Sequence, residues 1–131
     1  MLLTVRPGAG TEKREAVVTA WYRGQVAEAV PSLLAKWEPA IGVQAKQIIV
    51  RRMKTRWGSC TPTKGAIRLN TELGKKPREC LEYVLVHELV HLLEPTHNAR
   101  FIALMDKYLP HWRHLRAELN RAPLGHVEWE Y

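Results

Sequence analysis

The segment His87-Glu88-Leu89-Val90-His91 contains the residues of this chain whose types and spacing best suit metal chemistry. Two histidines four residues apart lie on one face of a helix, about one turn apart, where both imidazoles can bind the same Zn²⁺. Glu88 can reach the open side of such an ion and take the proton of a water molecule that attacks a carbonyl group. A shuffled chain of this composition would contain only roughly 0.02 copies of the pattern. The spacing therefore indicates a hydrolytic zinc site.

An alternative interpretation is a pair of ordinary core histidines held by hydrogen bonds. The helix predicted at Glu79–Leu93, just after Pro77, is apolar almost all round and should be buried. Burying two histidines and a glutamate there without a metal would lose several kcal/mol of solvation. Burial therefore favours metal binding.

A catalytic zinc usually has three protein ligands and one open position, so a third ligand is required. His97 is the preferred candidate, because Pro95 ends the helix and lets the chain turn back toward the metal. Other side chains remain open as the third ligand: Glu94, His111, His114 and Glu118.

Helices are predicted on both sides of the motif. Thr11–Ile41 has an apolar-leaning face, but Pro31 inside it predicts two helices or one kinked helix. After the motif, apolar residues three and four apart predict helices at 101–108 and 112–119. The residues after Asn120 are predicted to form a loop.

Two strands are predicted between a helix stop at Gly42 and the motif. Gln47–Thr55 is rich in β-branched residues and leads into a turn predicted at 57–59. Ala66–Asn70 alternates like a half-buried strand, and a loop with proline and glycine precedes it. We expect the two strands to form a hairpin within a small sheet.

Four stretches carry a more specific pattern: Arg52–Cys60, Ile67–Asn70, Leu81–His91 and His97–Phe101. Together they resemble the YgjP-like metal-dependent hydrolases, relatives of the SprT-like zinc metallopeptidases. The resemblance covers most of the chain, from about residue 11 to residue 120.

The resemblance implies an α+β fold of minimal zincin type, with a small sheet packed on the buried motif helix and flanking helices. It also implies Zn²⁺ held by His87, His91 and His97, with Glu88 as general base, in a metallopeptidase that cleaves peptide bonds of a peptide or protein substrate. One domain is expected over 1–131: a helical segment at 11–42, the sheet at 46–70, and the motif helix with the C-terminal helices at 78–120.

Two features of the cleft are less specific. In zincins an edge strand often pairs with extended substrate, and the resemblance gives this role to Ile67–Asn70. Four residues are candidates for stabilising an oxyanion, each with an ordinary packing or surface role as the alternative: Tyr83, Arg56, Asn70 and Arg100.

A basic stretch suggests a different function. Lys and Arg exceed Asp and Glu by 20 to 13, and five basic residues follow one another with no acid between them: Lys46, Arg51, Arg52, Lys54 and Arg56. With Trp57 as a stacking aromatic, this stretch could bind nucleic acid in a zinc module with little or no peptidase activity. We favour a solvated strand face with Trp57 in the core, and expect at most weak nucleic-acid binding.

Length and composition are those of an ordered globular protein, with 131 residues, 46% hydrophobic and 25% charged. No apolar run approaches the roughly 20 residues of a membrane span, and Met1–Arg6 is too short for a signal sequence. We therefore expect a cytoplasmic protein with no membrane partner, in which Cys60 and Cys80 are free thiols. Four further residues are assigned to the core: Met53, Trp21, Trp37 and Trp112.

Overall fold

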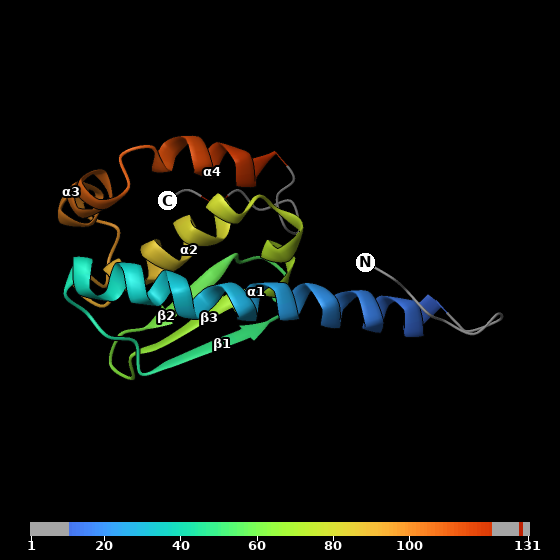
Figure 1. The fold of residues 1–131 in the computed structure, drawn as a ribbon. Helices are drawn as coiled ribbons and strands as arrows, with labels where there is room; N and C mark the ends of the chain where they lie inside the picture. The colour runs from blue at the N-terminus through green and yellow to red at the C-terminus, as the bar shows by residue number, and fades with distance from the viewer. Residues whose placement is uncertain (1–10, 122–128, 130–131) are drawn as a thin grey trace.

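A computed structural model describes residues 11–121 and 129, with only the backbone at 11–13, so most of the predicted loop after Asn120 lies outside the described residues. The elements are α1 (Thr11–Ile41), β1 (Gln47–Arg51), β2 (Gly58–Thr61), β3 (Ala66–Asn70), the short 3₁₀ helix η1 (Thr71–Lys75), α2 (Arg78–His91), α3 (Ala99–Tyr108) and α4 (Trp112–Asn120). This arrangement confirms the α+β class, with a small sheet and flanking helices (Figure 1).

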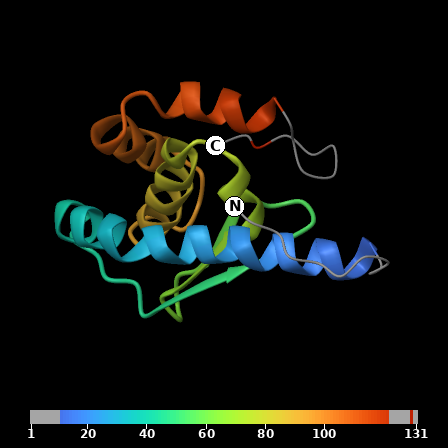
Figure 2. The ribbon, with the colours of Figure 1, turned by 45° about the vertical axis from the view of Figure 1, so that its right-hand side comes forward.

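Helix α2 lies at the centre of the molecule. The sheet and α1 pack on one side of it, and α3 and α4 on the other (Figures 1 and 2). Because it is covered from both sides, its apolar residues are inaccessible to solvent, and Val84, Leu85 and Val86 have no exposed surface. The predicted helix and its burial are therefore confirmed, although α2 ends at His91, two residues early.

Helix α1 is one element of 31 residues with Pro31 inside it, so of the two expected alternatives the division into two helices is wrong. The reason is packing: one buried face runs across the proline through Val26, Val30 and Leu33. The helix stops as predicted at Gly42, whose φ of +80° is unfavourable for other residues and whose N–H donates to the Glu38 carbonyl (2.9 Å).

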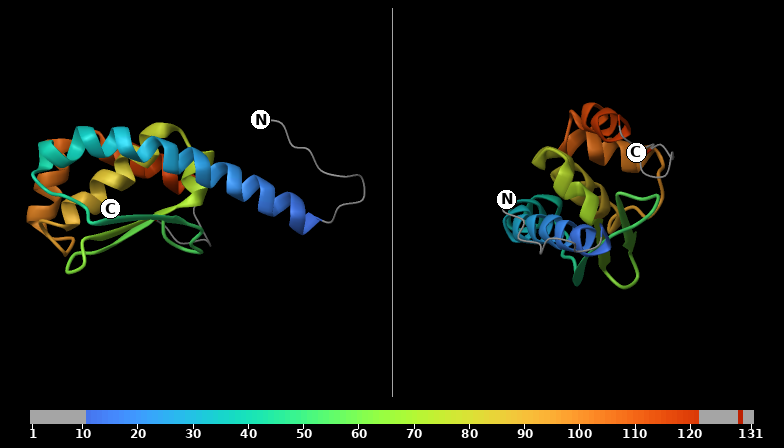
Figure 3. Two further views of the ribbon diagram at one scale, coloured as in Figure 1. Left: turned by 60° about the horizontal axis from the view of Figure 1, so that its bottom comes forward. Right: turned by 90° about the vertical axis from the view of Figure 1, so that its right-hand side faces the viewer.

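The N-terminal half of α1 extends beyond the body of the molecule (Figure 3). Trp21 lies on this half and is 39% exposed, so its assignment to the core is wrong. Met53 is only half-buried. Trp37 and Trp112 are core residues, as expected.

The sheet has the order β1-β3-β2, with β1 parallel and β2 antiparallel to β3. The predicted hairpin between the first and last strands is therefore wrong: the hairpin partner of β3 is β2, which begins in the predicted turn at 57–59. The predicted edge strand is also wrong, because β3 lies at the centre of the sheet.

Asn70 organises the connection that carries the chain from β1 past the end of β3 to β2. Its side-chain N–H groups donate to the carbonyls of Met53 (2.9 Å) and Arg56 (2.7 Å). Its side-chain oxygen accepts from the Glu72 N–H (3.0 Å) and caps η1. This fully buried amide explains how a non-local strand order is held in place.

Both Cys60 and Cys80 are free, as expected. None of the helices in the described part of the chain has the length and apolar character that a membrane crossing requires.

Candidate metal centre

Three histidine nitrogens converge at the end of α2. The Nε2 atom of His91 lies 3.2 Å from Nε2 of His87 and 2.9 Å from Nε2 of His97, and the remaining pair is 3.2 Å apart. Among the described residues, no other group of three histidine, cysteine or acidic side chains is placed to hold a metal ion. The structure therefore brings together the three histidines that the sequence singled out.

The local structure explains how a residue outside the helix reaches the two inside it. Beyond His91, the Glu94 carboxylate accepts hydrogen bonds from Thr96 Oγ1 (3.2 Å) and Asn98 Nδ2 (2.9 Å). Asn98 in turn caps α3 by accepting from the Phe101 N–H (3.0 Å). Glu94 thus holds the loop that carries His97 and is not part of the histidine group.

The histidines fit a metal ion by their protonation as well as their positions. Nδ1 of His91 lies 3.1 Å from the Glu94 carbonyl, which can only accept, so Nδ1 carries the proton and Nε2 offers a lone pair. Burial lowers the pKa of His91 and of His97, which favours neutral imidazole. Nitrogens about 2.1 Å from a tetrahedral zinc ion are about 3.4 Å apart, close to the separations found here.

Aromatic rings pack against this group, of which His87 and His91 are buried and His97 is exposed. The Phe101 ring packs against all three imidazoles, with centroid distances of 4.9 Å to His87, 4.6 Å to His91 and 4.9 Å to His97. On another side, the Trp129 ring lies 4.9 Å from the His87 ring. Trp129 follows the last helix and shows no periodic signal in the sequence, so sequence reasoning missed it.

Glu88 is buried beside the histidines. Its side chain is 2% exposed, and Oε2 lies 3.9 Å from Nε2 of His87 without a hydrogen-bond partner in the described structure. Burial raises the pKa of Glu88 to about 8, against the opposing charge of Arg56. A bound cation would favour the ionised carboxylate, so a metal fits both the lone pairs and this unpaired oxygen.

Gly58 lets strand β2 approach this carboxylate. A Cβ atom at Gly58 would lie 2.6 Å from Val84 Cγ1 and 3.0 Å from Glu88 Oε2. The neighbouring strand residue Cys60 has its pKa raised to about 12, by burial and then by the charge of Glu88. Sequence reasoning read Gly58 only as part of a turn, since a close approach between distant segments leaves no local signal.

The other candidate ligands lie elsewhere. His111 precedes α4, and His114 and Glu118 lie on that helix; none belongs to the histidine group. Glu118 is 3.0 Å from the Arg121 guanidinium.

The four candidates for stabilising an oxyanion differ in their surroundings. The Tyr83 hydroxyl is buried and accepts from Trp129 Nε1 (2.9 Å), and Asn70 is engaged by backbone groups. Arg100 is paired with Glu94 at 3.5 Å. Arg56 is exposed, and its charge acts on Glu88.

The basic stretch is exposed at all five positions: Lys46, Arg51, Arg52, Lys54 and Arg56. Trp57, in contrast, is 2% exposed and belongs to the core, as we favoured. The stretch therefore offers charge without the stacking ring that the nucleic-acid interpretation used.

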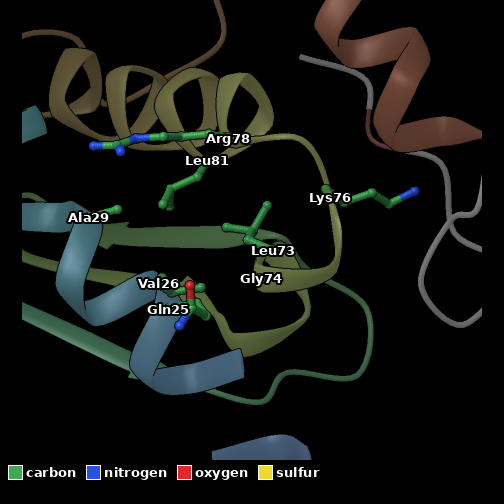
Figure 4. A pocket seen from close by; sticks show the side chains of 8 residues that line it. All are labelled: Gln25, Val26, Ala29, Leu73, Gly74, Lys76, Arg78 and Leu81. Atoms are coloured by element: carbon green, nitrogen blue, oxygen red, sulfur yellow. The ribbon is translucent and has the colours of Figure 1, made fainter. Parts of the chain in front are cut away.

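A pocket of about 210 Å³ lies apart from the histidines, between α1, η1 and the start of α2. Figure 4 shows apolar side chains that line it from three elements, Val26 from α1, Leu73 from η1 and Leu81 from α2, with the charged ends of Lys76 and Arg78 directed away from it. It contains none of the candidate catalytic residues.

An α+β fold in which a central helix carries two histidines and a buried carboxylate, with a third histidine returning from the next loop, defines the class of zincin-type metallopeptidases. The model of one family, the YgjP-like metallopeptidase domain, matches residues 2–122. The chain therefore belongs to the YgjP-like metallopeptidase family. Comparison with curated proteins finds no match.

Solved structures show the same fold. The metallopeptidase zymogen abylysin of Pyrococcus abyssi is similar with a TM-score of 0.64 and 24% identity, over 70% of this chain and 92% of that one. The metallopeptidase zymogen jannalysin of Methanocaldococcus jannaschii is similar with a TM-score of 0.58 and 19% identity, over 73% of this chain and 94% of that one.

Proposed function

We propose that this chain is a zinc-dependent peptidase in which His87, His91 and His97 hold the metal ion and Glu88 is the general base. The observation that carries the proposal is the convergence of three Nε2 atoms, 2.9–3.2 Å apart, beside a buried carboxylate oxygen with no hydrogen-bond partner in the described structure. Three neutral ligands leave the full charge of a divalent cation available for catalysis.

The roles of the protein groups follow from their positions. When bound, zinc supplies Lewis acidity that lowers the pKa of water and polarises a peptide carbonyl. Glu88 accepts the proton from the attacking water at Oε2 and delivers it to the nitrogen of the departing amine. The Glu88 side chain is itself only 2% exposed, so the carboxylate acts in a low-dielectric site.

The substrate proposed is an extended peptide or protein segment. Strand β2 pairs only with β3 within the described residues, which leaves its outer edge for a substrate strand. Strand β2 begins close to Glu88, because Gly58 permits the close approach. Pairing with backbone groups would bind many sequences, with specificity left to the side chains around the cleft.

The experiment compares Glu88→Gln with the wild type and with His91→Ala and His97→Ala. Glu88→Gln should retain zinc and fold but lose hydrolysis of a denatured protein substrate by at least about 10²-fold, since a general base contributes about 10²–10⁴. Elemental analysis should find near-stoichiometric zinc in the wild type and losses in both histidine variants. Full activity in Glu88→Gln, or zinc retained without His97, would contradict the proposal.

A further inference from the structure

The backbone of Trp129 is clamped to the end of α4. The Trp129 N–H donates to Asn120 Oδ1 (2.7 Å), and Asn120 Nδ2 donates to the Trp129 carbonyl (2.9 Å). One amide side chain thus satisfies both polar groups of the same residue, nine positions further along the chain. This pairing sets the place where Trp129 meets the body of the protein.

The indole ring of Trp129 is fixed independently. Its Nε1 donates to the Tyr83 hydroxyl at 2.9 Å. Tyr83 is itself fully buried and stacks on Trp112, with ring centroids 6.5 Å apart. The hydrogen bond therefore joins the indole to a rigid part of the core, and a donor–acceptor pair specifies its orientation as well as its position.

Tyr83 and His87 lie one helical turn apart on α2, so a ring held by Tyr83 falls beside His87. The Trp129 and His87 centroids are 4.9 Å apart with the planes inclined by 51°. Tyr83 meets the same imidazole edge-on at 6.1 Å, and Phe101 meets it at 4.9 Å. Three aromatic rings therefore surround His87 and restrict its rotation.

Resting on the three-histidine site proposed above, we propose that Trp129 is a positioning residue for the metal centre. Held by Asn120 and Tyr83, its indole keeps the His87 imidazole turned so that Nε2 faces the other two histidines. Groups that hold a ligand histidine by a hydrogen bond typically change metal affinity by about 10–100-fold when they are removed, and we expect an effect within this range for the packing of Trp129 on His87. Trp129 lies outside the region matched by the family model, residues 2–122, so the family match does not assign it this role.

The test measures zinc affinity of the full chain by competition with a chromophoric chelator. Trp129→Ala should bind zinc about 10–100-fold more weakly than the wild type. Trp129→Phe retains a ring but loses the bond to Tyr83, and should fall between the two. The matched control is Trp21→Ala, which removes an exposed indole on α1 and should leave zinc affinity unchanged. Circular dichroism of the metal-free variants checks the fold.

Two further measurements separate positioning from general support. The ligand-field spectrum of the Co²⁺-loaded protein should change in Trp129→Ala, because the direction of one ligand changes, and should be unchanged in Trp21→Ala. Tyr83→Phe removes the acceptor of the same hydrogen bond. The double variant, Tyr83→Phe with Trp129→Phe, should therefore lose no more zinc affinity than the single variant with the larger loss.

The outcomes distinguish the two proposals. A wild-type protein that binds no zinc would overturn the proposed function together with this inference. If Trp129→Ala has the same zinc affinity and Co²⁺ spectrum as a wild type that binds zinc, the inference about Trp129 is overturned. The three-histidine site is unaffected by that result. Higher peptidase activity in Trp129→Ala at unchanged affinity would also overturn the inference, since Trp129 would then cover the site.

Discussion

The buried Glu88 carboxylate fits against strand β2 only because one residue of that strand has no side chain. Gly58 provides that space, because the β2 backbone passes directly over Val84 and Glu88. The glycine is needed here for close approach and not for an unusual backbone angle. Its role can be tested separately from the chemistry of Glu88.

Gly58→Ala should destabilise the protein by about 1–3 kcal/mol, the usual effect of overpacking a core. The new methyl group would lie 2.6 Å from Val84 Cγ1 and 3.0 Å from Glu88 Oε2, so peptidase activity should fall as well. Denaturant unfolding and a peptidase assay measure both effects.

The matched control is Gly24→Ala on α1, where a Cβ atom would meet nothing within 4 Å. This variant should be as stable as the wild type or more so by about 0.5–1 kcal/mol, because alanine is the better helix former. Equal behaviour of the two variants would refute the packing argument for Gly58.

At the scale of elements, one carboxylate joins α1 to α2. Glu82 accepts hydrogen bonds from Trp37 Nε1 (2.8 Å) and Lys36 Nζ (3.0 Å). Burial acts to raise the pKa of Glu82, but these two hydrogen bonds, together with the charges of Lys36 and His111, outweigh it and the pKa is lowered. The contact therefore makes stability depend on pH.

Glu82→Gln should reduce the free energy of unfolding by about 1 kcal/mol at neutral pH. The pKa of Glu82 is lower in the folded protein than in the unfolded chain. Its contribution to stability is therefore fully present above pH 4.5, the ordinary pKa of glutamate, and is lost as the pH falls through the pKa of the folded state. The difference between variant and wild type should therefore shrink in acid, as followed by denaturant unfolding at several pH values. A difference that is constant with pH, or one shared by the exposed Glu28→Gln, would contradict this account.

Asn70 is the second element-scale residue, because three backbone groups from two segments depend on its side chain. Asn70→Ala should lower the free energy of unfolding by about 2–4 kcal/mol. It removes all three hydrogen bonds and takes from the carbonyls of Met53 and Arg56 the donor that Asn70 supplies. Asn98→Ala, which removes an exposed helix cap, should lower it by only about 1 kcal/mol. Thermal unfolding of the two variants compares them, and equal losses would argue against the organising role of Asn70.

At the scale of the whole molecule, the net charge of +7 raises the question of a polyanionic partner. The basic residues are exposed, but the aromatic beside them is buried. Electrostatic attraction to phosphate groups, without base stacking or contacts to base edges, supports only non-specific binding of nucleic acid.

Labelled duplex DNA should therefore bind weakly, with a Kd of about 10⁻⁴–10⁻⁶ M at physiological salt. Fluorescence anisotropy across salt concentrations measures the affinity and its slope, and Lys54→Gln should reduce the slope by about one. Tight, sequence-dependent binding at physiological salt would instead favour the alternative of a nucleic-acid-associated zinc module.

Much of the site could be predicted because its residues are neighbours in the chain. His87, Glu88 and His91 lie within one turn and a half of helix, so their relative positions follow from helix geometry alone. His97 required only the further step that Pro95 ends the helix. The helices after the motif were also predictable, since each has its own apolar periodicity.

The sequence by itself thus determined the spacing of His87, Glu88 and His91, the buried helix that carries them and the α+β class. Only the tertiary structure decided the strand order, the continuity of α1 through Pro31, the approach of Gly58 to Glu88 and the contact of Trp129 with His87. The reason is that helix spacing is set by backbone geometry within a few residues. Strand pairing and ring contacts depend instead on which distant segments pack together, and local patterns do not record that choice.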